Sequence, residues 1–179
     1  MINIIIEIWG DGASSGMANA PGGWGAVIKI DGEFHHQLGG GDLSTTNNIM
    51  EMKAIMCGIE SVLTMLTILN DPKGHDIEVI SDSRYVVGPF KEKWISKWRS
   101  YEWRKSMNSA IMRPNAELWK EFDNLVMAIS DGNAITWRQV KGHIGIVENE
   151  MCDQIAGVEK EKFRLLASNI KIAKLLEEL

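Results

Sequence analysis

The sequence predicts an α/β fold in which one five-stranded mixed sheet carries helices on both faces. The predicted elements follow in the order three strands, helix, strand, helices, strand, helix. Consecutive strands at the start favour antiparallel pairing, and the later alternation favours parallel crossovers through helices. We therefore expect the first three strands to be antiparallel and the later strands to join them through such crossovers.

The amino-terminal half supplies the three antiparallel strands and a long helix. Residues 2–9 alternate and are rich in isoleucine, which predicts a buried strand. A glycine-rich turn is expected over residues 10–23, so that Asp11 would lie just beyond the first strand. The next two strands form a hairpin around Asp31-Gly32. Serine and threonine hydroxyls then offer the N-cap of a helix over about 46–67.

The carboxy-terminal half alternates between helices and strands. In chain order we expect a fourth strand over 76–81, short helices over 83–99, a polar loop over roughly 100–114, an amphipathic helix over 115–129, a fifth strand over 134–140 and a helix over about 147–166.

The length of 179 residues fits one domain with a small appendage. We expect the domain to span residues 1–165 and an amphipathic helical extension to span residues 166–179. Four apolar residues of the extension share one helical face: Ile172, Leu175, Leu176 and Leu179. Two interpretations stay open, a helix that docks back onto the domain and a helix that mediates dimerisation or partner binding. Apart from such association, a monomer is expected.

The composition is that of a soluble globular protein, with 45% hydrophobic and 24% charged residues. No apolar run approaches the roughly 20 residues of a membrane span, and the start has no basic region typical of a signal peptide. Cys57 and Cys152 both fall in helical patterns, which favours two free thiols over a disulfide. These features predict a cytoplasmic protein without a membrane partner.

The net charge of −5 argues against nucleic-acid binding in general, because affinity for phosphates depends on lysine and arginine. The distribution of charge matters more than the total. Residues 91–105 carry six basic and two acidic residues, a net charge of +4, and three tryptophans lie among them. This segment is therefore the expected contact for a polyanion.

Four acidic residues in separate short motifs carry the strongest functional signal. They are Asp11 in WGDGASS, Glu51 in TTNNIMEMKA, Asp82 in VISDSRYV and Asp153 in ENEMCDQIAG. Each one alone is typical of a turn former, a helix cap or a solvated helix residue. Together they indicate a divalent metal site, because clustered carboxylates repel one another unless cations hold them.

These motifs, in this order over residues 1 to about 160 and with His143 in VKGHIG between the last two, resemble a type 1 ribonuclease H of the bacterial ribonuclease HI kind. The resemblance implies a ribonuclease-H-like fold and an endonuclease that hydrolyses the RNA strand of RNA–DNA hybrids. It makes residues 1–165 the catalytic domain, and it implies products with 3′-hydroxyl and 5′-phosphate ends.

The resemblance also assigns catalytic roles to five residues. The four acids would be the ligands of two Mg²⁺ ions, for which Mn²⁺ can substitute, about 3.5–4 Å apart around the scissile phosphate. His143 would shuttle protons or aid product release from a mobile loop between two glycines.

Contacts to the hybrid are expected from a second group of residues: Asn19, Thr46, Asn47, Asn48, Trp94 and Asn115. Asparagine both donates and accepts hydrogen bonds, which suits the 2′-hydroxyl that distinguishes RNA from DNA. The resemblance places Thr46 and Asn115 in a phosphate pocket for the DNA strand and Trp94 in an aromatic floor. Core packing for Trp94 and an ordinary helix-start role for Asn48 remain open.

One alternative function belongs to a different class, a catalytically silent protein that binds RNA–DNA hybrids without cutting them. That alternative expects at least one lost carboxylate, and all four are present in this sequence. The tandem His35-His36 lies in a predicted hairpin strand without a cysteine or acid pattern around it, which predicts a structural role.

Overall fold

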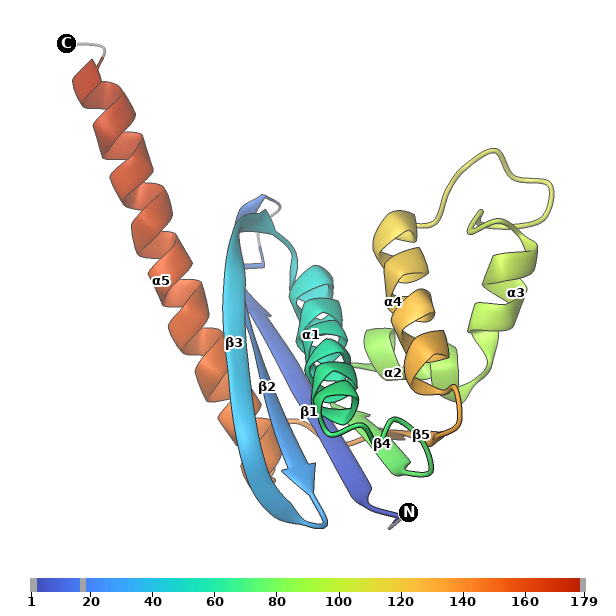
Figure 1. Cartoon of the computed structure of the whole chain (residues 1–179). Coiled ribbons are helices and arrows are strands. Elements are labelled where there is room, and N and C mark those ends of the chain that lie inside the picture. The colour runs from blue at the N-terminus through green and yellow to red at the C-terminus, as the bar shows by residue number, and fades with distance from the viewer. Residues whose placement is uncertain (1–2, 17–18, 178–179) are drawn as a thin grey trace.

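The computed structural model describes residues 3–16 and 19–177. Its centre is a sheet in the order β3-β2-β1-β4-β5 (Figure 1). The strands are β1 (Ile5–Ser14), β2 (Ala20–Ile30), β3 (Glu33–Thr45), β4 (Asp76–Ser81) and β5 (Ala134–Gln139). β1, β2 and β3 pair antiparallel, whereas β4 is parallel to both β1 and β5. The predicted five-stranded mixed sheet is confirmed.

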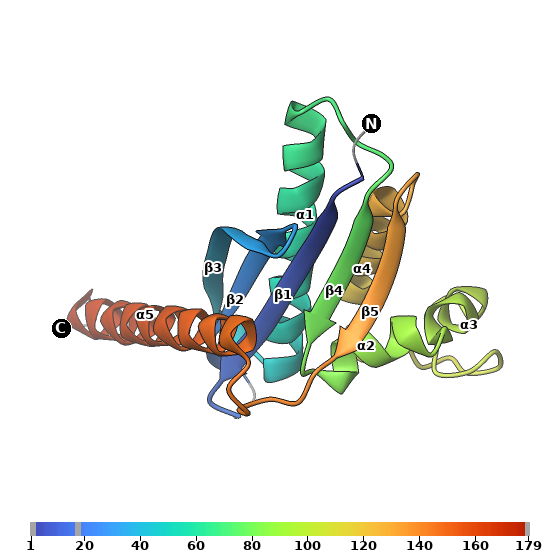
Figure 2. The ribbon, with the colours of Figure 1, turned by 90° about the horizontal axis from the view of Figure 1, so that it is seen from below.

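Helices cover both faces of this sheet, as predicted. They are α1 (Asn47–Ile68), α2 (Arg84–Lys91), α3 (Trp94–Ser100), α4 (Ala116–Ile129) and α5 (Val147–Glu177). Figure 2 shows α5 crossing one face while α1 and α4 lie behind the other. None of the helices in residues 3–16 and 19–177 combines the length and apolarity that a membrane crossing needs.

The two faces have separate cores because successive side chains of a strand point to opposite sides. On β1, Ile6 and Ile8 join the larger core beneath α1 and α4, where Trp119 and Phe122 are almost fully buried. Trp9 points the other way and packs beneath α5 in a smaller core that includes Val27, Ile80 and Cys152.

The glycine-rich turn predicted over residues 10–23 is wrong for most of its length. β1 continues to Ser14 and β2 begins at Ala20, so Asp11 lies inside a strand, opposite Gly25, and not beyond the strand end. The glycines permit close packing here. A Cβ atom at Gly23 or Gly25 would overlap the backbone of α5, which crosses directly over them.

The predicted end of the last helix near residue 166 is also wrong. α5 runs without interruption to Glu177, because residues 165–177 contain neither glycine nor proline. Its last turns project past the sheet (Figure 1), with Leu165 50% and Leu176 66% exposed. Leu179, predicted to share this apolar face, lies outside the described residues.

Candidate active site

Two of the predicted acids meet because β1 and β4 are parallel neighbours that run toward the same edge of the sheet. Asp11 lies in β1 and is 7% exposed, and Asp82 directly follows the last residue of β4. Burial, followed by the negative charge of Asp82, raises the pKa of Asp11 to about 7. Asp153 and Glu51 raise it further, while a hydrogen bond from the Gly12 backbone N–H opposes the rise. The other three acids therefore all lie within electrostatic reach of Asp11.

Glu51 reaches this cluster because α1 begins directly against β1. The Thr46 hydroxyl accepts a hydrogen bond from the Ile49 N–H at 3.4 Å and caps the helix. A Cβ atom at Gly12 would overlap the backbone nitrogen of Glu51. Glycine at position 12 thus lets the first turns of α1 approach the strand that carries Asp11.

Two neighbours hold the Glu51 carboxylate in place. Asn47 Nδ2 donates to its Oε1 at 2.7 Å, and Ser83 Oγ donates to its Oε2 at 2.5 Å. Burial raises the pKa of Glu51, with a contribution from Asp82, and the two hydrogen bonds act against this rise. The sequence gives only an indirect signal for Ser83, its place next to Asp82 at the start of the predicted short helices.

Asp153 lies in the second turn of α5, and His143 lies in the loop that leads into this helix. His143 Nδ1 is 4.0 Å from Asp153 Oδ2, with 76% of the histidine side chain exposed. A Cβ atom at Gly142 would overlap Asp82 Oδ2, so the loop passes directly beside the acids. His143 itself has a left-handed backbone with φ of 55°. The loop therefore brings an exposed imidazole to the edge of the cluster.

The cluster suits a divalent cation in charge and in donor chemistry. Carboxylate oxygens are the donors that Mg²⁺ and Mn²⁺ prefer. Burial is the main cause of the raised pKa of Asp11, and the negative charges of Asp82, Asp153 and Glu51 add to it. Within the described part of the chain, no three His, Cys, Asp or Glu side chains are close enough to enclose an ion. The other three acids are nevertheless close enough to Asp11 to raise its pKa.

The predicted hybrid contacts fall into two places. Near the acids, Asn47 Oδ1 accepts from the Ser14 N–H at 3.1 Å while its amide group holds Glu51. Asn48 is exposed on the first turn of α1, and Asn19 is exposed in the turn between β1 and β2 with φ of 60°. Asn47 therefore orients a carboxylate, whereas Asn48 and Asn19 face solvent.

The other predicted hybrid contacts, Trp94 and Asn115, lie at an aromatic groove built from α2, α3 and α4. The groove is lined by Arg84, Tyr85, Pro89, Trp94, Trp98, Arg113, Pro114 and Trp119. Trp94 is 39% exposed, and Asn115 Nδ2 donates to Tyr85 Oη at 3.1 Å. The Arg113 guanidinium lies 4.3 Å from the centre of the Trp98 ring. This groove joins flat apolar surfaces with cationic side chains.

Part of the basic charge near this groove is already paired within the protein. Arg99 binds the buried Asp123 carboxylate through Nε at 2.5 Å and Nη2 at 2.7 Å. Arg104 pairs with Glu102 at 2.8 Å. The charge available to a polyanion is therefore smaller than the sequence total over residues 91–105 suggests.

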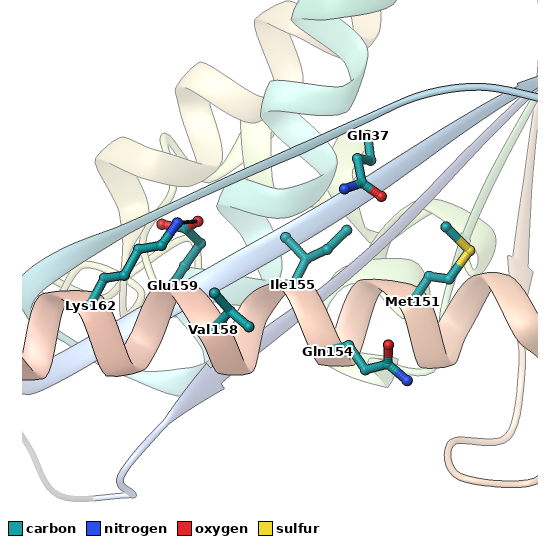
Figure 3. Close-up of a pocket in the computed structure, with 7 residues that line it drawn as sticks. All are labelled: Gln37, Met151, Gln154, Ile155, Val158, Glu159 and Lys162. Carbon is teal, nitrogen blue, oxygen red and sulfur yellow. Dashed lines mark hydrogen bonds and ion pairs between the residues drawn. The ribbon is translucent and has the colours of Figure 1, made fainter.

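Another groove lies between α5 and β3, away from the acids. Figure 3 shows the residues that line it: Gln37, Met151, Gln154, Ile155, Val158, Glu159 and Lys162. None of the four acids is among them, so this groove is not part of the candidate active site.

Comparison with known proteins identifies the family. The model of the RNase H family matches residues 4–161, nearly the whole chain. The chain belongs to the ribonuclease H family. It is accordingly an enzyme, an endoribonuclease H of the hydrolase class, from a family that depends on divalent metal ions.

Bacterial ribonucleases H are among its relatives. The chain is 36% identical over 152 residues to ribonuclease H of Thermoanaerobacter sp. (strain X514), which covers 85% of this chain and 87% of the relative. It is 36% identical over 157 residues to ribonuclease H of Legionella pneumophila (strain Corby), and this alignment covers 88% of this chain and 97% of the relative.

Solved structures show the same ribonuclease H fold. LC9-RNase H1, described as a type 1 RNase H with the type 2 active-site motif, matches with a TM-score of 0.69 and 20% identity, covering 90% of this chain and 74% of that one. LC11-RNase H1, solved in complex with an RNA/DNA hybrid, matches with a TM-score of 0.63 and 19% identity. This match covers 88% of this chain and 97% of that one.

Proposed function

We propose that this ribonuclease H cuts the RNA strand of RNA–DNA hybrids at the cluster of Asp11, Glu51, Asp82 and Asp153, which would hold two Mg²⁺ ions. The products would carry 3′-hydroxyl and 5′-phosphate ends. One observation supports the proposal above all: burial raises the pKa of Asp11 to about 7, and each of the other three acids contributes to the rise. Such crowding destabilises a protein unless cations bind there.

The chain's own residues would prepare this site. Bound metal ions supply Lewis-acid polarisation of the phosphate and a water of lowered pKa. Asn47 and Ser83 hold the Glu51 carboxylate in one orientation, which is the role of outer partners around metal ligands. His143, exposed and beside Asp153, would carry a proton between the site and solvent. No side-chain nucleophile is required.

The hybrid would lie across the acids and the aromatic groove. Trp94 offers an exposed ring to a sugar face, and neighbouring Arg84 and Arg113 suit phosphates. Further contacts are proposed from the other predicted polar residues: Asn19, Thr46, Asn47, Asn48 and Asn115. Because these partners address sugars and phosphates, cutting should show little preference for base sequence.

We further propose that residues 1–165 are the catalytic domain and that the protein is monomeric, with residues 166–179 as an extension. The exposed apolar side chains of α5 supply the surface if association occurs. The alternative of a silent hybrid-binding protein loses support because all four acids are present and coupled.

A panel of single substitutions tests the proposal. Asp11→Asn, Glu51→Gln, Asp82→Asn and Asp153→Asn should each lower hybrid cleavage by at least about a hundredfold, because each removes a charge that the ions need. Glu161→Gln is the matched control, since Glu161 is an exposed acid paired with Arg164 on α5. Full activity in Asp11→Asn with intact folding would refute the assignment.

A further inference from the structure

A β-bulge in β3 gives two consecutive histidines an unusual arrangement. Side chains of neighbouring residues in a regular strand point to opposite faces. Here Ile28 pairs with His36 while Lys29 pairs with Phe34, so His35 is an extra residue without a partner on β2. A bulge of this kind redirects side chains. It turns the imidazoles of His35 and His36 toward each other.

The two rings meet through their Nδ1 atoms, which are 2.6 Å apart. The other ring nitrogen of His36, Nε2, lies 2.7 Å from Ser61 Oγ on α1. If Nε2 carries the proton and donates it to Ser61, His36 presents a free lone pair at Nδ1. One proton is then shared between the two Nδ1 atoms of this short contact.

We propose that His35 and His36 form a two-nitrogen site for a borderline divalent transition metal such as Cu²⁺, Ni²⁺ or Zn²⁺. The metal replaces the shared proton, which moves through solvent to Nε2 of His35, so both imidazoles remain neutral ligands. Metal–nitrogen bonds of about 2.0–2.1 Å place two ligands on one ion roughly 3 Å apart. The rings therefore need to separate only slightly from their present contact.

The surroundings of His36 match those of a metal-binding histidine. Such histidines donate their second ring nitrogen to an oxygen, which fixes the tautomer and the ring orientation. Ser61 occupies this position. Among the described residues no third His, Cys, Asp or Glu side chain joins the pair, so water would complete the coordination.

This site is separate from the candidate active site. Ser61 follows Glu51 by ten residues on α1, which is about 15 Å along the helix axis. Imidazole nitrogens select borderline metals, whereas the carboxylates select Mg²⁺ and Mn²⁺. Metal binding at His35 and His36 therefore does not rest on the proposed cleavage mechanism, and hybrid cleavage should not need it.

Titration of the EDTA-treated full chain with Cu²⁺, followed by calorimetry and electron paramagnetic resonance, tests the proposal. We expect one equivalent of Cu²⁺ to bind tightly, with a spectrum that shows coupling to two nitrogens. Ni²⁺ and Zn²⁺ should bind more weakly. His35→Ala should abolish it without unfolding the protein, since His35 is exposed. Ser61→Ala should weaken it by about tenfold or more. His143→Ala is the control and should retain it.

Two results would overturn this site. One is Cu²⁺ binding of equal affinity and unchanged spectrum in His35→Ala and His36→Ala. The other is a spectrum in which only oxygen ligands appear, as expected from the acid cluster. Mg²⁺-dependent cleavage measured on His35→Ala and His36→Ala keeps the two proposals apart, because loss of Cu²⁺ binding with normal cleavage leaves the active site intact.

Discussion

Asp11 is a buried carboxyl whose pKa is raised to about 7 by burial and by neighbouring acids. Its folded-state pKa lies above the ordinary value of 3.8, so the folded protein binds this proton more tightly than the unfolded chain does. The stability that this proton on Asp11 gives the folded protein is complete below about pH 4 and is lost as the pH rises through about 7. Above pH 7 the metal-free protein carries an unfavourable buried charge.

Asp11→Asn should therefore stabilise the metal-free protein at pH 8 by about 1–3 kcal/mol, because it removes that charge. The gain should shrink as the pH falls from 7 toward 4. Urea unfolding in EDTA at several pH values measures it. An Asn variant that is less stable than the natural protein at pH 8 would show that the carboxylate is not strained.

Ser83 should act through the orientation of Glu51. Ser83→Ala removes a donor to the Glu51 carboxylate, so we expect activity at limiting Mg²⁺ to fall by about tenfold. The same hydroxyl caps α2 by accepting from the Val86 N–H. Ser83→Thr keeps both hydrogen bonds and is the matched control. A Mg²⁺ dependence of cleavage that is the same in Ser83→Ala and the natural protein would exclude this role.

The sequence motifs were sufficient to predict the acids, because each acid sits in a recognisable local context. They were not sufficient for Ser83 or Gly142, whose contacts join residues far apart in the chain. Ser83 reaches Glu51 across 32 positions, and Gly142 leaves room for Asp82. Such partners appear only when the sheet order is known.

At the scale of elements, glycines determine how closely α5 packs on the sheet. A Cβ atom at Gly25 would overlap the carbonyl of Cys152, whereas one at Gly157, within α5, would meet open space. Gly25→Ala should destabilise the protein by about 1–3 kcal/mol through overpacking. Gly157→Ala should stabilise it by up to about 1 kcal/mol through helix propensity. Denaturant unfolding of both variants checks this contrast, and equal effects would contradict the packing.

The last turns of α5 should contribute little to the stability of the domain. Leu165, Ile172 and Leu176 are each at least half exposed. Deleting residues 168–179 should therefore change the free energy of unfolding by less than about 1 kcal/mol and leave cleavage intact. A loss of several kcal/mol would mean that this segment packs against something, and a change in the molecular mass in solution would identify a second copy as that partner.

The sequence predicted the kinds of elements better than their ends. Strand and helix periodicity was visible, and the mixed sheet followed from element order. Most of the glycine-rich stretch lies in β1 and β2 and not in the predicted turn. Glycine permits both tight turns and close packing, and only the position of α5 distinguishes them. The end of the family resemblance near residue 160 is not a physical helix boundary, so α5 continues through the predicted extension to Glu177.

For the whole molecule, the topology explains the site. The parallel pair β1 and β4 brings Asp11 and Asp82 to one edge of the sheet, while α1 and α5 reach that edge from opposite faces with Glu51 and Asp153. The net charge of −5 is compatible with a nucleic-acid substrate, because part of the excess is concentrated where cations would bind.

The most direct test of the account is a cleavage assay with a hybrid whose RNA and DNA strands are labelled in turn. It is run in Mg²⁺ and in EDTA, with single- and double-stranded RNA as controls. The account predicts cutting of the RNA strand of the hybrid alone, only in Mg²⁺, with 3′-hydroxyl and 5′-phosphate ends. Tight hybrid binding without cutting, or cutting that persists in EDTA, would contradict it.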